Sequence, residues 1–221
     1  MKHGKFSIVS QFLPKLALGA ASAAVALSLS PTVASAEDTE TYRIDPVHSN
    51  VGFKVKHLFT FVNGRFDDLS GTISLDSKKP ENSSVDVKIE TKSINTANEK
   101  RDAHLRSGDF FDVEKHPTIT FKSKSVKQTG ENTADVVGDL TLLGVTKEVT
   151  LKTELLGKGK GMEGGQVSGW RAQTSIKRSD HGMTWGKLVE GTPLIGDEVE
   201  ILIDVEAPEA PKAKAETASA K

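Results

Sequence analysis

Short segments in which apolar and polar residues alternate recur through most of the chain, and they constrain the fold more than any other feature. An alternation with a period of two places apolar side chains on one face of a β-strand and polar side chains on the other. The clearest segments are 50–57, 69–75, 85–91, 119–124, 134–142, 149–155, 170–176 and 199–205. Their short connections and one-sided patterns predict an all-β fold, an antiparallel sheet of roughly eight strands. An eight-stranded sheet can close into a barrel, and a two-sheet sandwich of similar strand count fits the same periodicity.

One segment does not alternate, and it predicts a short helical excursion near residues 96–107. Thr96 and Glu99 have the spacing of a capping box, and Ser107-Gly108 would end the helix. Phe110 and Phe111 follow directly, and adjacent residues cannot both lie on one face of a strand. We therefore expect this segment to cross the mouth of the β-structure with its aromatic side chains. The alternative is a connection whose two rings only plug the core.

The two ends of the chain differ in composition from its middle. Residues 1–36 begin with basic residues, continue with the uncharged run Leu16 to Leu29 and end in Ala34-Ser35-Ala36, which has the small-x-small pattern of signal peptidase sites. This predicts a signal peptide cleaved after Ala36, with a retained anchor as the alternative. Residues 37–206 are then one β-domain, and 207–221, rich in Ala, Pro and Lys, form a predicted disordered tail.

Charge and cysteine content exclude several classes of function. Without the signal peptide the chain has 26 basic and 30 acidic residues, a net charge of −4, and no basic patch suited to nucleic acid. The absence of cysteine excludes disulfides, thiolate metal sites, a cysteine nucleophile and a lipid-modified cysteine. We expect a protein of the Gram-negative periplasm, without stable membrane insertion after cleavage. Secretion beyond the outer membrane stays open.

The predicted inward faces combine large and small apolar residues. Small residues inside a barrel leave volume, and an eight-stranded barrel is wide enough either to be filled by side chains or to hold one small ligand. If it holds a ligand, the predicted apolar contacts are Phe53, Val55, Phe59, Phe61, Phe66, Leu105, Phe110, Phe111, Phe121, Gly138, Leu140, Trp170, Ala172 and Trp185. His57 and Arg65 are the candidate contacts to a polar head group, with ordinary surface solvation as their alternative. A core of interlocking large and small residues is the alternative for the whole interior.

Catalytic and metal-binding motifs are absent from the sequence. The chain has no H-E-x-x-H, G-x-S-x-G, P-loop or G-x-G-x-x-G pattern. Asp102, His104 and Ser107 are close in sequence, yet residues two apart on a helix do not share a face, so they form no triad. We therefore expect no enzymatic activity and no cofactor. A metal site assembled in three dimensions from distant histidines and carboxylates stays open.

A set of fragments in fixed order resembles the YceI-like proteins. The fragments are Tyr42-Arg-Ile-Asp45, His48-Ser49, residues 51–57, Gly64-Arg-Phe66, 93–96, 101–106, 109–112, 116–121, 138–147 and 195–199. The resemblance covers about residues 41–206 and implies a single extended, lipocalin-like antiparallel β-barrel of the bacterial periplasm. It also implies a long polyisoprenoid or similar amphiphile in the lumen and no assigned catalysis.

We therefore expect a periplasmic carrier or store for a long-chain isoprenoid lipid of the quinone or polyprenyl type, and leave a homodimer open. The first alternative is a solid-cored β-domain that binds a protein partner through residues 157–165 or the tail. The second is a metal- or haem-linked redox protein.

Overall fold

The computed structural model describes residues 39–162 and 164–211. The predicted signal peptide and residues 212–221 of the predicted tail lie outside this part of the chain. Among the described residues, no helix has the length and apolar character needed to cross a membrane.

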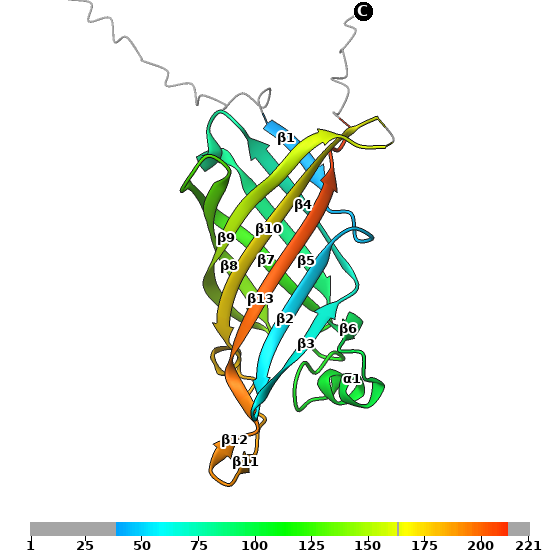
Figure 1. The fold of residues 1–221 in the computed structure, drawn as a ribbon, viewed down its shortest axis with the longest axis vertical. Helices are drawn as coiled ribbons and strands as arrows, with labels where there is room; N and C mark the ends of the chain where they lie inside the picture. The colour runs from blue at the N-terminus through cyan, green and yellow to red at the C-terminus, as the bar shows by residue number, and fades with distance from the viewer. Residues whose placement is uncertain (1–38, 163, 212–221) are drawn as a thin grey trace, which may run out of the picture. The chain divides into compact units, whose positions relative to one another are not determined.

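The described chain forms one large, curled antiparallel sheet and a small two-stranded sheet. Figure 1 shows the long strands winding around a common axis, with α1 and the β11–β12 hairpin beside one end and β1 at the other. The large sheet has eleven strands in the order β1-β4-β5-β7-β8-β9-β10-β13-β2-β3-β6. Its members are β1 (Thr39–Arg43), β2 (Asn50–His57), β3 (Thr60–Phe66), β4 (Leu69–Asp76), β5 (Ser84–Glu90), β6 (Ile94–Asn95), β7 (Thr118–Gln128), β8 (Thr133–Leu142), β9 (Val145–Lys160), β10 (Gln166–Lys177) and β13 (Ile195–Pro208). The small sheet pairs β11 (Leu188–Val189) with β12 (Thr192–Pro193).

The all-β class and the antiparallel pairing agree with the alternation, but the predicted count of eight strands is not what the structure has. The continuously apolar segment 58–62, whose sequence does not decide between a short helix and a rim segment, contains the turn after β2 and the start of strand β3. β6 is only two residues long and gives no periodic signal. A sandwich is not found in the described part of the chain, because β1 to β10 and β13 all belong to one hydrogen-bonded order.

The sheet curls far enough for β1 to meet the chain at the C-terminal end of β13. β1 pairs with β4, and Tyr42 also forms a β-bridge with Glu209, while the amide of Ala210 donates to the carbonyl of Thr41 over 2.7 Å. β13 thus continues to Pro208, past the domain end that we predicted at Glu206. Ala207 is completely buried and packs with Tyr42 and Ile73.

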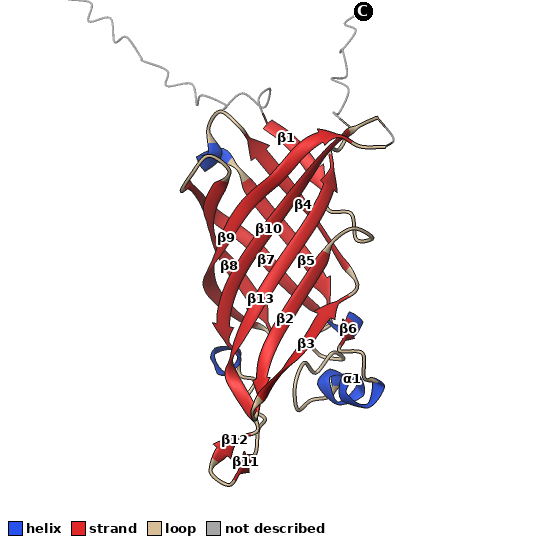
Figure 2. Cartoon of the chain, in the orientation of Figure 1, coloured by secondary structure: helices blue, strands red, loops and turns tan. Residues whose placement is uncertain are grey.

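The helix α1 (Glu99–Arg106) lies within the predicted excursion, but the predicted capping box is wrong. The N-cap is Asn98, whose side chain accepts a hydrogen bond from the amide of Arg101 over 3.0 Å. Thr96 is buried instead, and its hydroxyl and amide both donate to the carboxylate of Asp102. Figure 2 shows α1 outside the strands, beside the end of the sheet where β3 and β6 meet.

Candidate ligand cavity

The curled sheet encloses an apolar cavity with a volume of about 330 Å³. Of its 33 lining residues, five have polar side chains: His57, Arg101, His104, Thr174 and Arg178. The aliphatic part of the lining comes from nearly every long strand, including Val51, Ile89, Leu140, Val149, Ile176 and Ile201. The inward faces therefore do not fill the interior completely, as a solid core would require. An apolar pocket with a few convergent polar groups is the usual form of a small-molecule site.

The β1 end of the sheet is closed by its own core. Tyr42 and Ala207 are fully buried there and pack with Ile73, and the partly buried Trp170 covers this cluster. The indole Nε1 of Trp170 donates to Ser168 Oγ over 2.9 Å. None of these side chains lines the cavity, so the cluster seals this end.

The α1 end is where the cavity reaches the surface, because the 43% exposed side chain of His104 belongs to its lining. His104, Phe110 and Trp185 form a cluster in which every pair of ring centroids is 5.0 Å apart. We call these three residues the aromatic rim. His104 Nε2 also lies 2.8 Å from Asp109 Oδ2, which orients the imidazole. The rim thus joins the helical excursion to the chain that follows β10.

Phe111 extends the aromatic surface from the excursion into the interior. Its ring meets Phe66 edge to face with 5.6 Å between centroids, and Phe66 in turn lies 5.9 Å from Phe53. Phe110 is only 6% exposed. Both adjacent phenylalanines therefore line the cavity, Phe110 within the aromatic rim and Phe111 against Phe66.

A buried arginine holds the chain after β10 against the cavity. Arg178 is 9% exposed, and its guanidinium donates to the carbonyls of Gly196, Met183 and Trp185 over 2.9, 2.9 and 2.7 Å. Each of these backbone acceptors would otherwise need water in an apolar setting. Nearby, the hydroxyl and amide of Ser179 both donate to Asp197, and these hydrogen bonds lower the pKa of that carboxyl group. Arg178 thus fixes the position of Trp185 at the rim.

A second arginine anchors the start of the helix. Arg101 donates from Nε to Thr96 Oγ1 over 2.7 Å and from its terminal nitrogen to the Thr96 carbonyl over 2.9 Å. The segment between β6 and α1 is therefore tied to the helix by Arg101, which also lines the cavity.

Most of the predicted ligand contacts lie in the cavity wall. Those that line it are Phe53, Val55, Phe66, Leu105, Phe110, Phe111, Phe121, Leu140 and Trp185, together with the predicted head-group residue His57. Sequence reasoning missed Arg101, His104, Arg178, Met183 and Leu194. None of these five lies in a strand, so no two-residue alternation marks them as inward-facing.

The other predicted contacts lie elsewhere. Phe59 is 91% exposed in the β2–β3 turn, and Phe61 is half-exposed beneath the ammonium of Lys54, 4.3 Å from its ring centroid. Arg65 points outward to an ion pair with Asp67. Gly138, Trp170 and Ala172 do face inward but do not line the cavity. A side chain at 138 would collide with the Phe121 ring, Ala172 packs behind the lining residues Phe121 and Leu151, and Trp170 packs on the cluster at the β1 end.

Comparison with known proteins relates the whole β-domain to one family. A family model described as the YceI-like domain matches residues 42–207. A UPF0312 protein of Pseudomonas paraeruginosa is 41% identical over 187 residues, which are 83% of this chain and 95% of that protein.

Solved structures share the architecture. The YCEI protein of Campylobacter jejuni superposes with a TM-score of 0.62 at 36% identity, over 75% of this chain and 96% of that one. A polyisoprenoid-binding domain of Saccharophagus degradans superposes with a TM-score of 0.57 over 76% of this chain and 98% of that one. At 18% identity, the second likeness shows the fold alone.

Proposed function

The chain belongs to the YceI-like family, and on that premise we propose that it binds a long isoprenoid lipid inside the curled sheet. The observation that carries the proposal is the apolar cavity, closed at the β1 end and reaching the surface at the aromatic rim. The S. degradans domain has the same fold and is described as polyisoprenoid-binding, which supports a ligand of this class.

The closed end sets the direction of binding. A slender apolar chain enters past the rim and ends against the cluster around Tyr42, so the polar end of the lipid stays near His57 and His104. A quinone or a prenyl alcohol suits these groups, because an imidazole can donate a hydrogen bond to either oxygen.

The energetics suit a carrier or a store. Each buried methylene contributes roughly 0.8 kcal/mol. Freezing the torsions of the lipid and extracting it from a membrane offset much of this gain. The net affinity is then moderate, and the cargo can be released. Export by the predicted signal peptide would place this binding activity in the periplasm. We propose binding without catalysis.

Native mass spectrometry of untagged, gently purified protein tests the proposal. We expect a bound hydrophobic mass that organic extraction releases, and uptake of added ubiquinone or a polyprenol by stripped protein. A folded protein with no bound mass and no uptake of either compound would refute isoprenoid binding.

A further inference from the structure

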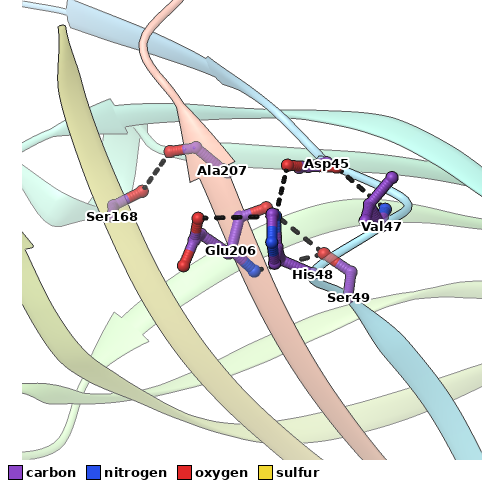
Figure 3. Close-up of polar contacts among 7 residues, drawn as sticks. All are labelled: Asp45, Val47, His48, Ser49, Ser168, Glu206 and Ala207. Atoms are coloured by element: carbon purple, nitrogen blue, oxygen red, sulfur yellow. Dashed lines mark hydrogen bonds and ion pairs between the residues drawn. The ribbon is translucent and has the colours of Figure 1, made fainter. Parts of the chain in front are cut away.

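The loop between β1 and β2 and the end of β13 bring together a histidine and two carboxylates outside the cavity. Asp45 and His48 lie in the loop, and Glu206 projects from β13, as Figure 3 shows. Asp45 and Glu206 are 161 positions apart in sequence, yet one ligand atom from each of the three residues lies within 4.8 Å of the other two. From this geometry we propose that Asp45, His48 and Glu206 form a binding site for a divalent transition-metal ion of the zinc type.

The distances suit such an ion. His48 Nδ1 lies 2.8 Å from Asp45 Oδ2 and 3.8 Å from Glu206 Oε1. Ligands placed about 2.0–2.2 Å from a zinc ion are separated by roughly 3.0–3.5 Å from each other. The two observed separations bracket this range, so small side-chain rotations would seat the ion. It would replace the hydrogen bond between His48 and Asp45.

The backbone that carries the three ligands is already in place. The amide of Asp45 donates to the Glu206 carbonyl over 2.9 Å, and Ser49 Oγ accepts from the Glu206 amide over 3.1 Å. Asp45 Oδ1 accepts from the amide of Val47 over 2.8 Å, which turns Oδ2 toward His48. These contacts fix the backbone of all three residues, so an ion would have to order only their side chains.

The charge of the cluster also favours a cation. In the described part of the chain, the ion pairs of Asp45 and Glu206 both run to His48, and neither carboxylate is paired with lysine or arginine. With a neutral imidazole the cluster has a charge of −2, which a divalent ion balances. An imidazole ligand favours zinc, nickel or copper over calcium and magnesium, which prefer oxygen ligands only. The side chains of His48 and Glu206 are 62% and 49% exposed, so water can complete the coordination.

Isothermal titration of untagged, EDTA-treated protein with Zn²⁺ tests the site. We expect one ion per chain, with binding weakened roughly tenfold or more in His48→Gln and in Glu206→Gln. His116→Gln is the matched control, since it removes a histidine far from the cluster in sequence, and it should bind as the parent does. An unchanged affinity in His48→Gln, or no saturable binding by the parent, would overturn the proposal.

Two further readouts separate a metal site from a surface of negative charge. Cu²⁺ bound to the parent should give an electron paramagnetic resonance signal with histidine nitrogen couplings, and His48→Gln should lose them. Zn²⁺ should also raise the melting temperature of the parent but not of Glu206→Gln, because the ion would cross-link the loop to β13. Ca²⁺ binding as tight as Zn²⁺ binding would identify non-specific attraction to carboxylates and overturn the site.

Discussion

The imidazole of His104 and the indole of Trp185 meet edge to face, with 5.0 Å between ring centroids and an interplanar angle of 90°. His104 comes from α1 and Trp185 from the chain after β10, so this one contact joins two segments 81 residues apart at the mouth of the cavity. Aromatic pairs of this geometry contribute roughly 0.5–1.5 kcal/mol beyond the burial of their area. A contact of this strength can hold the two segments together and still break if the proposed ligand passes between them.

Trp185→Ala should shorten the time for which a bound isoprenoid is retained. The substitution opens the rim but leaves the strands unchanged, so we expect dissociation about tenfold faster, which corresponds to about 1.4 kcal/mol. Stopped-flow transfer of a fluorescent prenyl lipid to acceptor vesicles measures this rate. Trp185→Phe should restore most of the retention, and equal rates in the parent and the alanine variant would show that the ligand leaves by another route.

Val55→Phe should block binding without unfolding the protein. Val55 lines the cavity, and the added ring occupies space that the lipid needs, while the stability should change by only about 1 kcal/mol because the space is empty in the free protein. Lipid uptake by the stripped variant, followed by native mass spectrometry, measures the effect. Val137→Phe is the matched control on β8, next to the inward-facing Val136 and outside the cavity lining, and it should bind normally.

Trp170→Ala and Phe121→Ala should separate stability from binding. Trp170 covers the sealed end, so its loss should cost about 2–3 kcal/mol of unfolding free energy and leave lipid occupancy intact. Phe121 lines the cavity and is 7% exposed, so its loss should cost roughly 3–5 kcal/mol and also alter occupancy. Urea unfolding and native mass spectrometry on the same samples measure both effects. Reduced occupancy in a folded Trp170→Ala variant would extend the ligand site to the β1 end.

Asp76 should make the protein less stable in acid. Its carboxylate accepts hydrogen bonds from the Asn82 side chain and from the amides of Lys79 and Lys78, and these lower its pKa. A carboxyl group whose pKa is lower in the folded state contributes stability above its unfolded pKa of about 3.9, and this stability is lost as the pH falls through the folded value.

Urea unfolding of the parent and of Asp76→Asn, in steps of about 0.5 pH unit between pH 2.5 and 7, measures this contribution. The asparagine variant should be less stable than the parent at neutral pH, and the difference should shrink as the pH falls. A difference that stays constant over the whole range would assign the loss to altered packing.

Alternation alone predicted the strands that have one face toward the interior and one toward solvent. β2, β5, β8 and β10 each place apolar side chains toward the interior, and their inward residues were identified correctly wherever the strand is regular. The start of β3 could not be predicted, because the apolar run 58–62 shows no alternation, and Phe59 and Phe61 within it are exposed. The apolar character of that turn is a property of the surface, which periodicity does not distinguish from the core.

The cavity wall could be predicted along the strands but not at its two ends. The closed end depends on Tyr42 meeting Ala207, a contact between the first and last strands that no local pattern contains. The open end depends on Arg178, whose three acceptors are backbone carbonyls with no sequence signature. The cluster around His48 has no sequence motif for the same reason. Asp45 lies three residues before His48, but Glu206 lies far along the chain in β13.

The chain has two tryptophans, one in the sealed cluster and one at the mouth. Replacing Trp170 with phenylalanine would leave Trp185 as the single tryptophan, and its emission maximum would report the polarity of the cavity entrance. Binding and release of the proposed lipid could then be followed by tryptophan fluorescence in real time, without an attached dye.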